Sequence, residues 1–279
     1  YNKDLFSAAG IADPPKDWDT FSKDSAKLTK LSTEGAVLQS GAAMGTSANI
    51  DRSVDILSLL MMQSGAQMTD EFGAATFQDM PAGMTAVNPP ALTAVRFYTD
   101  FANPTRTVYT WSPTMPNSFE AFATGKTAMM IGYNYHLPLI KARAPKLNFD
   151  VSNVPQLQEH GGINFANYWL YTVAKKSKNP DGAWSFIQFL TNPQYVGAYL
   201  KATNKPPALK ALAVLDSDDP YLPFWNSQIL SARSWYRGVN PVAAEDVMKT
   251  LIDTYLTGGF TDLLEPINLA SEKVTQTIR

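Results

Sequence analysis

The chain has 279 residues, of which 45% are hydrophobic and 17% charged, and its formal net charge is -2 at pH 7. That apolar content suffices for one large core or two modest ones, as in an ordinary soluble globular protein. Because there is no excess positive charge to neutralise phosphates, nucleic acid is excluded as an expected partner, and so is an anionic membrane surface. The chain has no cysteine, which excludes disulfides and cysteine-based zinc sites and slightly favours an extracytoplasmic location.

Helical patterns dominate the first half of the chain. Asp17 is expected to cap an amphipathic helix over residues 18–31, whose apolar side chains recur at helical spacing. Asn49 is expected to cap a helix over residues 50–63, which is apolar on nearly every side and should be buried. Further apolar patterns with proline, serine or glycine at their ends predict helices over residues 88–101, 118–125 and 133–143.

Short apolar or alternating segments predict the strands. Residues 127–131 (TAMMI) are too short and apolar for anything but a buried strand or core segment. Residues 148–155 alternate between apolar and polar and precede a glycine-bearing loop, so a strand and a change of domain are expected there. Residues 165–174 are predicted as another strand. The remaining predicted helices cover residues 179–190, 193–203, 241–256 and 261–278.

Catalytic and metal-binding motifs are weak. The two histidines, His136 and His160, lack metal-binding spacing and have no third histidine to join them, so no metal site or cofactor is expected. Asp51 and Asp55 would share one helix face and could be the paired carboxylates of a glycan-processing enzyme. We favour a structural role, in which Asp51 meets the helix dipole and Arg52 and solvent satisfy Asp55. The expected protein is therefore not an enzyme.

Aromatic residues beside polar ones give a stronger indication of function, because they suit a ligand-binding site. They occur as YNY after the TAMMI segment and as WYR in a loop-like stretch near the C-terminus. A sugar ring offers a C–H face that stacks on aromatic rings, whereas its hydroxyls need amide, carboxylate or guanidinium partners. Although aromatic residues are more often part of a core, this composition favours a sugar or related polyol as ligand. The candidate residues are Tyr133, Asn134, Tyr135, Trp235, Tyr236 and Arg237.

The order of four longer motifs carries more information than any one of them. They are YNKDLF at the start, FEAFATGKTAMMIG, KKSKNPDGAWSFIQFLTNPQY and NKPPALKAL. Together they closely resemble the family 1 extracellular solute-binding proteins of bacterial ABC importers, of the maltose-binding-protein-like sugar type. The resemblance implies an α/β, type II periplasmic-binding-protein fold, in which two lobes joined by hinge crossovers hold the solute between them. It also implies that the chain lacks most of the N-terminal lobe.

The resemblance assigns domains and further ligand contacts. Residues 1–150 match the main part of the C-terminal lobe, and residues 151–215 match a hinge strand with the remaining part of the N-terminal lobe. Residues 216–279 match the return to the C-terminal lobe with its terminal helices. Because YNYH stands where the maltose binder is rich in tryptophan, a ligand other than maltose is expected. Besides the two aromatic stretches, the implied ligand contacts are Thr46, Ser47, Asn49 and Trp169.

The implied role is the capture of a sugar or polyol and its delivery to the transmembrane permease subunits of an ABC importer. The expected protein is a monomer outside the cytoplasm, in the periplasm or at the outer face of the cell membrane, either free or lipid-anchored. Two alternatives stay open. One is a glycan-processing enzyme that uses Asp51 and Asp55, and the other is a solute-sensing domain that serves a receptor.

Overall fold

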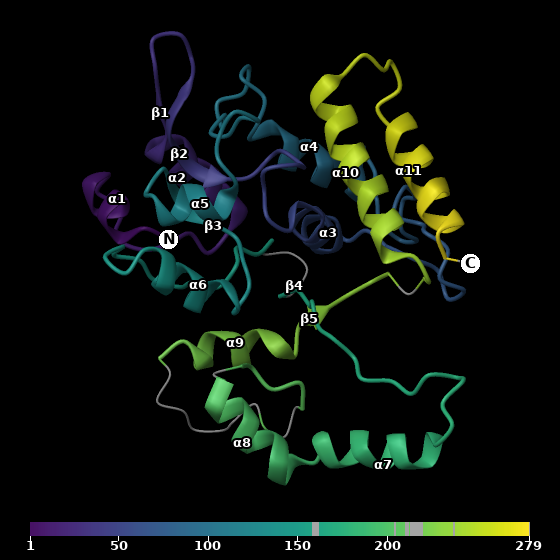
Figure 1. Cartoon of the computed structure of the whole chain (residues 1–279). Coiled ribbons are helices and arrows are strands. Elements are labelled where there is room, and N and C mark those ends of the chain that lie inside the picture. The colour runs from purple at the N-terminus through teal and green to yellow at the C-terminus, as the bar shows by residue number, and fades with distance from the viewer. Residues whose placement is uncertain (158–161, 204, 210–211, 213–219, 237, 279) are drawn as a thin grey trace. The chain divides into compact units, whose positions relative to one another are not determined.

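A computed structural model of the chain describes residues 1–157, 162–203, 205–209, 212, 220–236 and 238–278. The chain forms two compact units (Figure 1), which we call the larger unit (Tyr1–Phe165 with Trp235–Arg279) and the smaller unit (Ala166–Ser234). Among the described residues, no helix combines the length and the apolar character that crossing a bilayer requires.

A three-stranded sheet and eight helices form the described part of the larger unit. Strand β1 (Lys30–Leu31) pairs antiparallel with β2 (Val37–Ala43), which pairs parallel with β3 (Thr127–Met130). Strand β4 (Asn164–Phe165) lies where the chain leaves this unit. The helices are α1 (Lys3–Ala8), α2 (Trp18–Leu28), α3 (Ser53–Gln63), α4 (Pro90–Asp100), α5 (Ser118–Ala123), α6 (His136–Arg143), α10 (Pro241–Thr257) and α11 (Glu265–Gln276).

The central strand β2 consists largely of small residues because α2 crosses it at close range. A Cβ atom added to Gly41 would lie only 1.9 Å from the Ser25 carbonyl oxygen. The backbone N–H groups of Gly41 and Ala42 donate to the buried Thr110 Oγ1, at 2.7 and 3.2 Å. The Gly41 N–H also donates to Thr29 Oγ1 at 3.1 Å, so Thr110 and Thr29 together satisfy backbone N–H groups of β2.

Helix α3 lies in the centre of the core. All of its residues except Asp55 are buried, and α4 and α10 contact it. At its last residue, the Gln63 side-chain amide donates to the carbonyl oxygens of Pro155 (3.2 Å) and Ile163 (2.9 Å). The Gln63 Oε1 accepts from the Trp18 indole N–H at 2.7 Å. Gln63 thus joins α2 and α3 to the segment that leads into β4.

The smaller unit exposes an unusual amount of apolar surface. It contains α7 (Pro180–Leu190), α8 (Pro193–Thr203), α9 (Leu222–Ile229) and β5 (Ala232–Arg233). Neither α7 nor α8 buries any residue, although a helix as apolar as α7 is normally buried. Surfaces of this kind are typical of contact sites for other polypeptide. The large exposed side chains of this unit include Tyr168, Trp169, Leu170, Tyr171, Trp184, Phe186, Phe189, Tyr195 and Tyr199.

Several predicted elements are confirmed. Asp17 caps α2, since its Oδ1 accepts from the Thr20 N–H at 2.7 Å, and Asn179 caps α7 by accepting from the Gly182 N–H at 3.0 Å. The TAMMI segment forms β3, whose first three residues are buried. Helices were also predicted correctly at α4, α5, α8, α10 and α11, with boundary shifts of a few residues at some ends.

The predicted start of the buried helix is wrong. Helix α3 begins at Ser53, because Arg52 has the left-handed backbone conformation (φ 61°, ψ 32°) and interrupts any helix before it. Asn49 therefore caps no helix, and Asp51 lies in the loop before α3.

Two predicted strands are also wrong, and the strands β1, β2 and β5 were missed. In residues 148–155 the structure has only an isolated bridge, between Phe149 and Asn2, and of residues 165–174 only Phe165 lies in a strand. Strand β2 lies within residues 35–47, where no strand was predicted, because glycine, alanine and serine carry a weak strand signal. The short helices α1 and α9 were also not predicted.

The boundaries of the smaller unit, Ala166–Ser234, fall later than those of the predicted segment 151–215. The residues before it belong to the larger unit because apolar side chains there, among them Ile163, pack against its core. The chain re-enters the larger unit at Trp235, whose indole N–H donates to the Ser58 Oγ at 3.1 Å.

Replacing Gly41 tests the close crossing of α2 and β2. Gly41→Ala is expected to lower the free energy of unfolding by about 3 kcal/mol, because the added methyl group meets backbone atoms that cannot move alone. Gly162→Ala is the control, since its methyl group would meet nothing closer than 3.9 Å. Urea unfolding followed by tryptophan fluorescence measures both, and equal stability of the two variants would contradict the crossing.

Replacing Gln63 tests its role as a junction. Gln63→Leu is expected to cost about 3 kcal/mol or more, because it leaves the Trp18 donor and two backbone acceptors buried without partners. Gln67→Leu is the matched control, since the Gln67 side chain is exposed and its one printed hydrogen bond is long (3.4 Å). Chemical denaturation measures both variants, and a Gln63→Leu variant as stable as the control would refute this role.

Candidate functional site

The loops that follow β2 and β3 leave the same edge of the sheet, because the two strands run parallel. The carboxyl edge of parallel strands is where α/β proteins commonly place their ligands. The first loop ends in Arg52 at the start of α3, and the second carries Tyr133 and Tyr135 before α6. We call Asp51, Arg52, Asp55, Tyr133, Tyr135 and His136 the edge cluster.

Asp55 connects the two loops. Its Oδ2 accepts from the Arg52 Nε–H at 2.8 Å and from the Tyr133 hydroxyl at 2.7 Å, across 78 positions of sequence. The Arg52 guanidinium carbon lies 6.0 Å from the centre of the Tyr133 ring, within cation–π range. Burial, together with the negative charge of Asp55, raises the pKa of Tyr133. The Tyr133 hydroxyl therefore stays protonated and remains a donor to Asp55.

Tyr135 is the exposed aromatic ring of the edge cluster. It stacks on Tyr133, with ring centres 5.8 Å apart and planes at 18°, and it remains 48% exposed. Its ring centre lies 4.2 Å from that of His136, which is buried and accepts from the Tyr133 backbone N–H at 3.0 Å. Burial lowers the pKa of His136, although Asp51, at 3.8 Å, opposes this shift. The imidazole is therefore neutral at pH 7.

The edge cluster combines the groups that a polyhydroxylated ring requires. Tyr135 offers ring surface, and the side chains of Arg52 and Asp51 are each about one third exposed, at 33% and 34%. A guanidinium donates to hydroxyl oxygens, whereas a carboxylate accepts from hydroxyl groups. The arrangement can therefore stack a sugar ring and form hydrogen bonds to its hydroxyls.

Three of the predicted ligand contacts instead form hydrogen bonds that stabilise the first loop. Thr46 and Ser47 are buried; the Thr46 hydroxyl donates to Asn49 Oδ1, and the Ser47 hydroxyl donates to Asp253 Oδ1 at 2.5 Å. Asn49 Oδ1 also accepts from the Trp111 indole N–H at 3.0 Å, and the Asn49 amide donates to two backbone carbonyls. These side chains shape the loop, and their contact with a ligand stays a prediction.

Two predicted residues near the C-terminus also have internal partners. Trp235 is buried in the core and donates to Ser58, as described above. The Tyr236 hydroxyl donates to the Thr277 carbonyl at 2.9 Å. Arg237 lies outside the described residues. The ligand contacts predicted for this stretch remain predictions.

The two remaining predicted residues lie in different units. Asn134 is in the second loop of the larger unit, between the stacked tyrosines, and its carbonyl accepts from the Leu137 N–H at 3.1 Å. Trp169 belongs to the smaller unit and is 97% exposed. Of the predicted residues, the structure therefore brings Tyr133 and Tyr135 together with Asp55 and Arg52.

Sequence reasoning missed part of this cluster. The predicted pairing of Arg52 with Asp55 is confirmed, but neither Arg52 nor His136 was assigned to the site. One signal was available in the sequence. Arg52 and Asp55 are opposite charges three positions apart in an otherwise apolar predicted helix, and such charges fit only where the helix leaves the core. Among the described residues, no group of three potential metal ligands is arranged to hold an ion.

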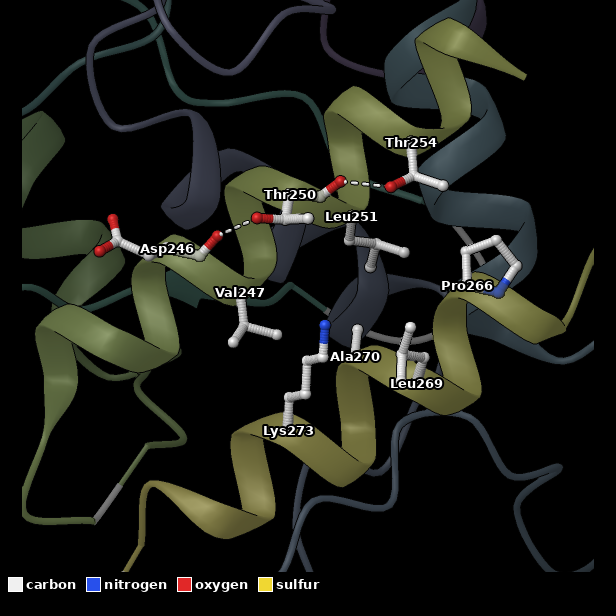
Figure 2. Close-up of a pocket in the computed structure, with 9 residues that line it drawn as sticks. All are labelled: Asp246, Val247, Thr250, Leu251, Thr254, Pro266, Leu269, Ala270 and Lys273. Carbon is white, nitrogen blue, oxygen red and sulfur yellow. Dashed lines mark hydrogen bonds between the residues drawn. The ribbon is translucent and has the colours of Figure 1, made fainter. Parts of the chain in front are cut away.

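A hollow lies between α10 and α11 (Figure 2) and has a volume of about 190 Å³. The hydroxyls of Thr250 and Thr254 each donate to a carbonyl of the preceding helical turn, at 2.8 Å, as the dashed lines show. None of the nine residues drawn there is aromatic or carries an amide side chain. This hollow therefore has a carboxylate and an ammonium group but lacks the aromatic ring on which a sugar would stack.

Known proteins resemble this chain in sequence and in fold. A protein of Brucella abortus (strain 2308), named as a candidate binding protein, is 27% identical over 224 residues, which are 77% of this chain and 49% of that relative. The chain thus spans about half the length of that relative.

Solved structures share the fold, and two of them are identified by what they bind. One is an ABC transporter solute-binding protein from Thermotoga lettingae bound with alpha-D-tagatose (TM-score 0.74, 20% identity, covering 100% of this chain and 69% of that one). The other is the cyclic alpha-maltosyl-1,6-maltose binding protein from Arthrobacter globiformis (TM-score 0.74, 18% identity, 100% and 68%). The fold is therefore of the α/β, periplasmic-binding-protein type, and the partial coverage agrees with the predicted incomplete lobe.

The family model of the bacterial extracellular solute-binding proteins matches residues 1–197, which is well over half of the chain. Its match includes β2, β3 and both loops of the edge cluster. The chain therefore belongs to the bacterial extracellular solute-binding protein family.

Proposed function

We propose that the protein captures a sugar or related polyol outside the cytoplasm and delivers it to the permease subunits of an ABC importer. The observation that supports this ligand class is the exposed Tyr135 ring, stacked on Tyr133 beside the Arg52–Asp55 pair. The sugars named for the Thermotoga and Arthrobacter proteins support the same class. The protein acts as a monomer, and it is free in the periplasm or held at the outer face of the cell membrane by a lipid anchor.

We assign the larger unit to the C-terminal lobe and the smaller unit to the part of the N-terminal lobe present in this chain. The partial coverage of the related structures supports this assignment, and so does the exposed apolar surface of α7 and α8. In a protein of this kind, the ligand favours the closed form through contacts that only that form makes. Trp169 in the smaller unit and Asn134 in the larger one are the proposed contacts beyond the edge cluster.

Catalysis by Asp51 and Asp55 is the less favoured function. The Asp55 Oδ2 already accepts from both Arg52 and Tyr133, so this carboxylate connects the two loops of the site. Asp51 Oδ1 accepts from the Asn117 side-chain amide at 2.7 Å. A sensing role would use the same binding site and differs from transport only in the partner protein.

Removing the Tyr135 ring tests the ligand class. The full-length gene product is screened by calorimetry and thermal shift against mono- and oligosaccharides, because a ligand of the native state raises its apparent stability. Tyr135→Ala is expected to weaken binding about fivefold to tenfold through loss of stacking. Phe72→Ala is the control, since Phe72 is 84% exposed in the larger unit outside the edge cluster. The absence of any sugar ligand would contradict the proposal.

Incubation with glycosides tests the catalytic alternative. The full-length protein is expected to release every bound oligosaccharide unchanged, as judged by chromatography after prolonged incubation. Steady product formation that disappears in Asp55→Asn would instead establish an enzyme and contradict the carrier.

A further inference from the structure

The edge cluster contains more negative than positive charge among its described side chains. Asp51 and Asp55 carry two carboxylates, and Arg52 is the one guanidinium. His136 is neutral at pH 7, because its burial disfavours the charged ring. A ligand that reaches this cluster therefore meets a cation that already has a carboxylate partner, and a second carboxylate, Asp51, that is one third exposed.

The geometry of Arg52 further limits what it can bind. Its Nε–H is used by Asp55 at 2.8 Å, and the guanidinium is held near the face of Tyr133. The left-handed backbone conformation of Arg52 fixes the position of its Cβ atom. Bidentate recognition of a carboxylate uses two parallel N–H groups of one guanidinium, and one such edge of Arg52 is committed to Asp55. Its terminal N–H groups form the other edge, which can donate to hydroxyl oxygens or to a carboxylate, so discrimination against a carboxylate falls to Asp51.

From this arrangement we infer that the edge cluster selects an uncharged sugar and rejects the same sugar carrying a carboxylate, with Asp51 as the residue that enforces the selection. Hydroxyl groups can donate to Asp51 and accept from Arg52, whereas a carboxylate can do only the second and is repelled by Asp51. The inference rests on the proposed function and deepens it, because it names the charge of the ligand.

Paired neutral and acidic sugars test the inference on the full-length gene product. Glucose, galactose and mannose are each compared with the corresponding uronate, as monomers and as trimers, by calorimetry at low ionic strength. The best neutral ligand is expected to bind at least about tenfold more tightly than its uronate. Asp51→Asn removes one negative charge but keeps an oxygen for Asn117, and it is expected to reduce this ratio about threefold or more.

Asp100→Asn is the matched control, because Asp100 pairs with Arg106 at 3.0 Å outside the edge cluster and its replacement changes the net charge equally. The control is expected to leave the ratio unchanged. A uronate that binds as tightly as its neutral sugar would overturn the inference and leave the proposed function intact. An equal effect of Asp100→Asn would overturn the role of Asp51. If no sugar of either kind binds, the proposed function fails together with the inference.

Discussion

Burial of α3 on every side is the constraint on which the rest of the larger unit depends. A helix covered all round needs a protein partner for each polar side chain that it buries, as Ser58 has in the Trp235 indole N–H. Asp55 in the first turn and Gln63 in the last turn satisfy this requirement. Gln63 fixes the segment that leads towards the smaller unit, and Asp55 fixes the two loops of the edge cluster.

The edge cluster also holds a strained backbone position. The left-handed conformation costs a residue other than glycine about 1–2 kcal/mol. Arg52 retains it while its side chain pairs with Asp55 and lies near the Tyr133 ring. Strain that is maintained by surrounding contacts is typical of binding sites, where it sets side chains in place before the ligand arrives. The contacts with Asp55 and Tyr133 therefore hold the Arg52 side chain in place within the edge cluster.

Local sequence signals predicted the elements that depend on local interactions. The capped helices α2 and α7 and the apolar strand β3 follow from residues within a few positions of each other. Strand β2 could not be recognised, because its small residues serve the crossing of α2, which is set by the tertiary fold. The aromatic pair of the site was visible as Tyr133 and Tyr135. Its connection to Asp55 was not, because it requires the parallel pairing of β2 with β3.

The positions of the tryptophans give the two units different optical properties. Trp18, Trp111 and Trp235 are buried in the larger unit, whereas in the smaller unit Trp169 and Trp184 are 97% and 49% exposed and Trp225 is half-buried. Indole emission shifts to the red in water, and a dissolved quencher reaches only exposed rings. A single fluorescence spectrum of the chain therefore contains a blue, protected component from the larger unit and a red, quenchable one from Trp169 and Trp184. A polypeptide that covers these two exposed rings will therefore shift and protect the second component.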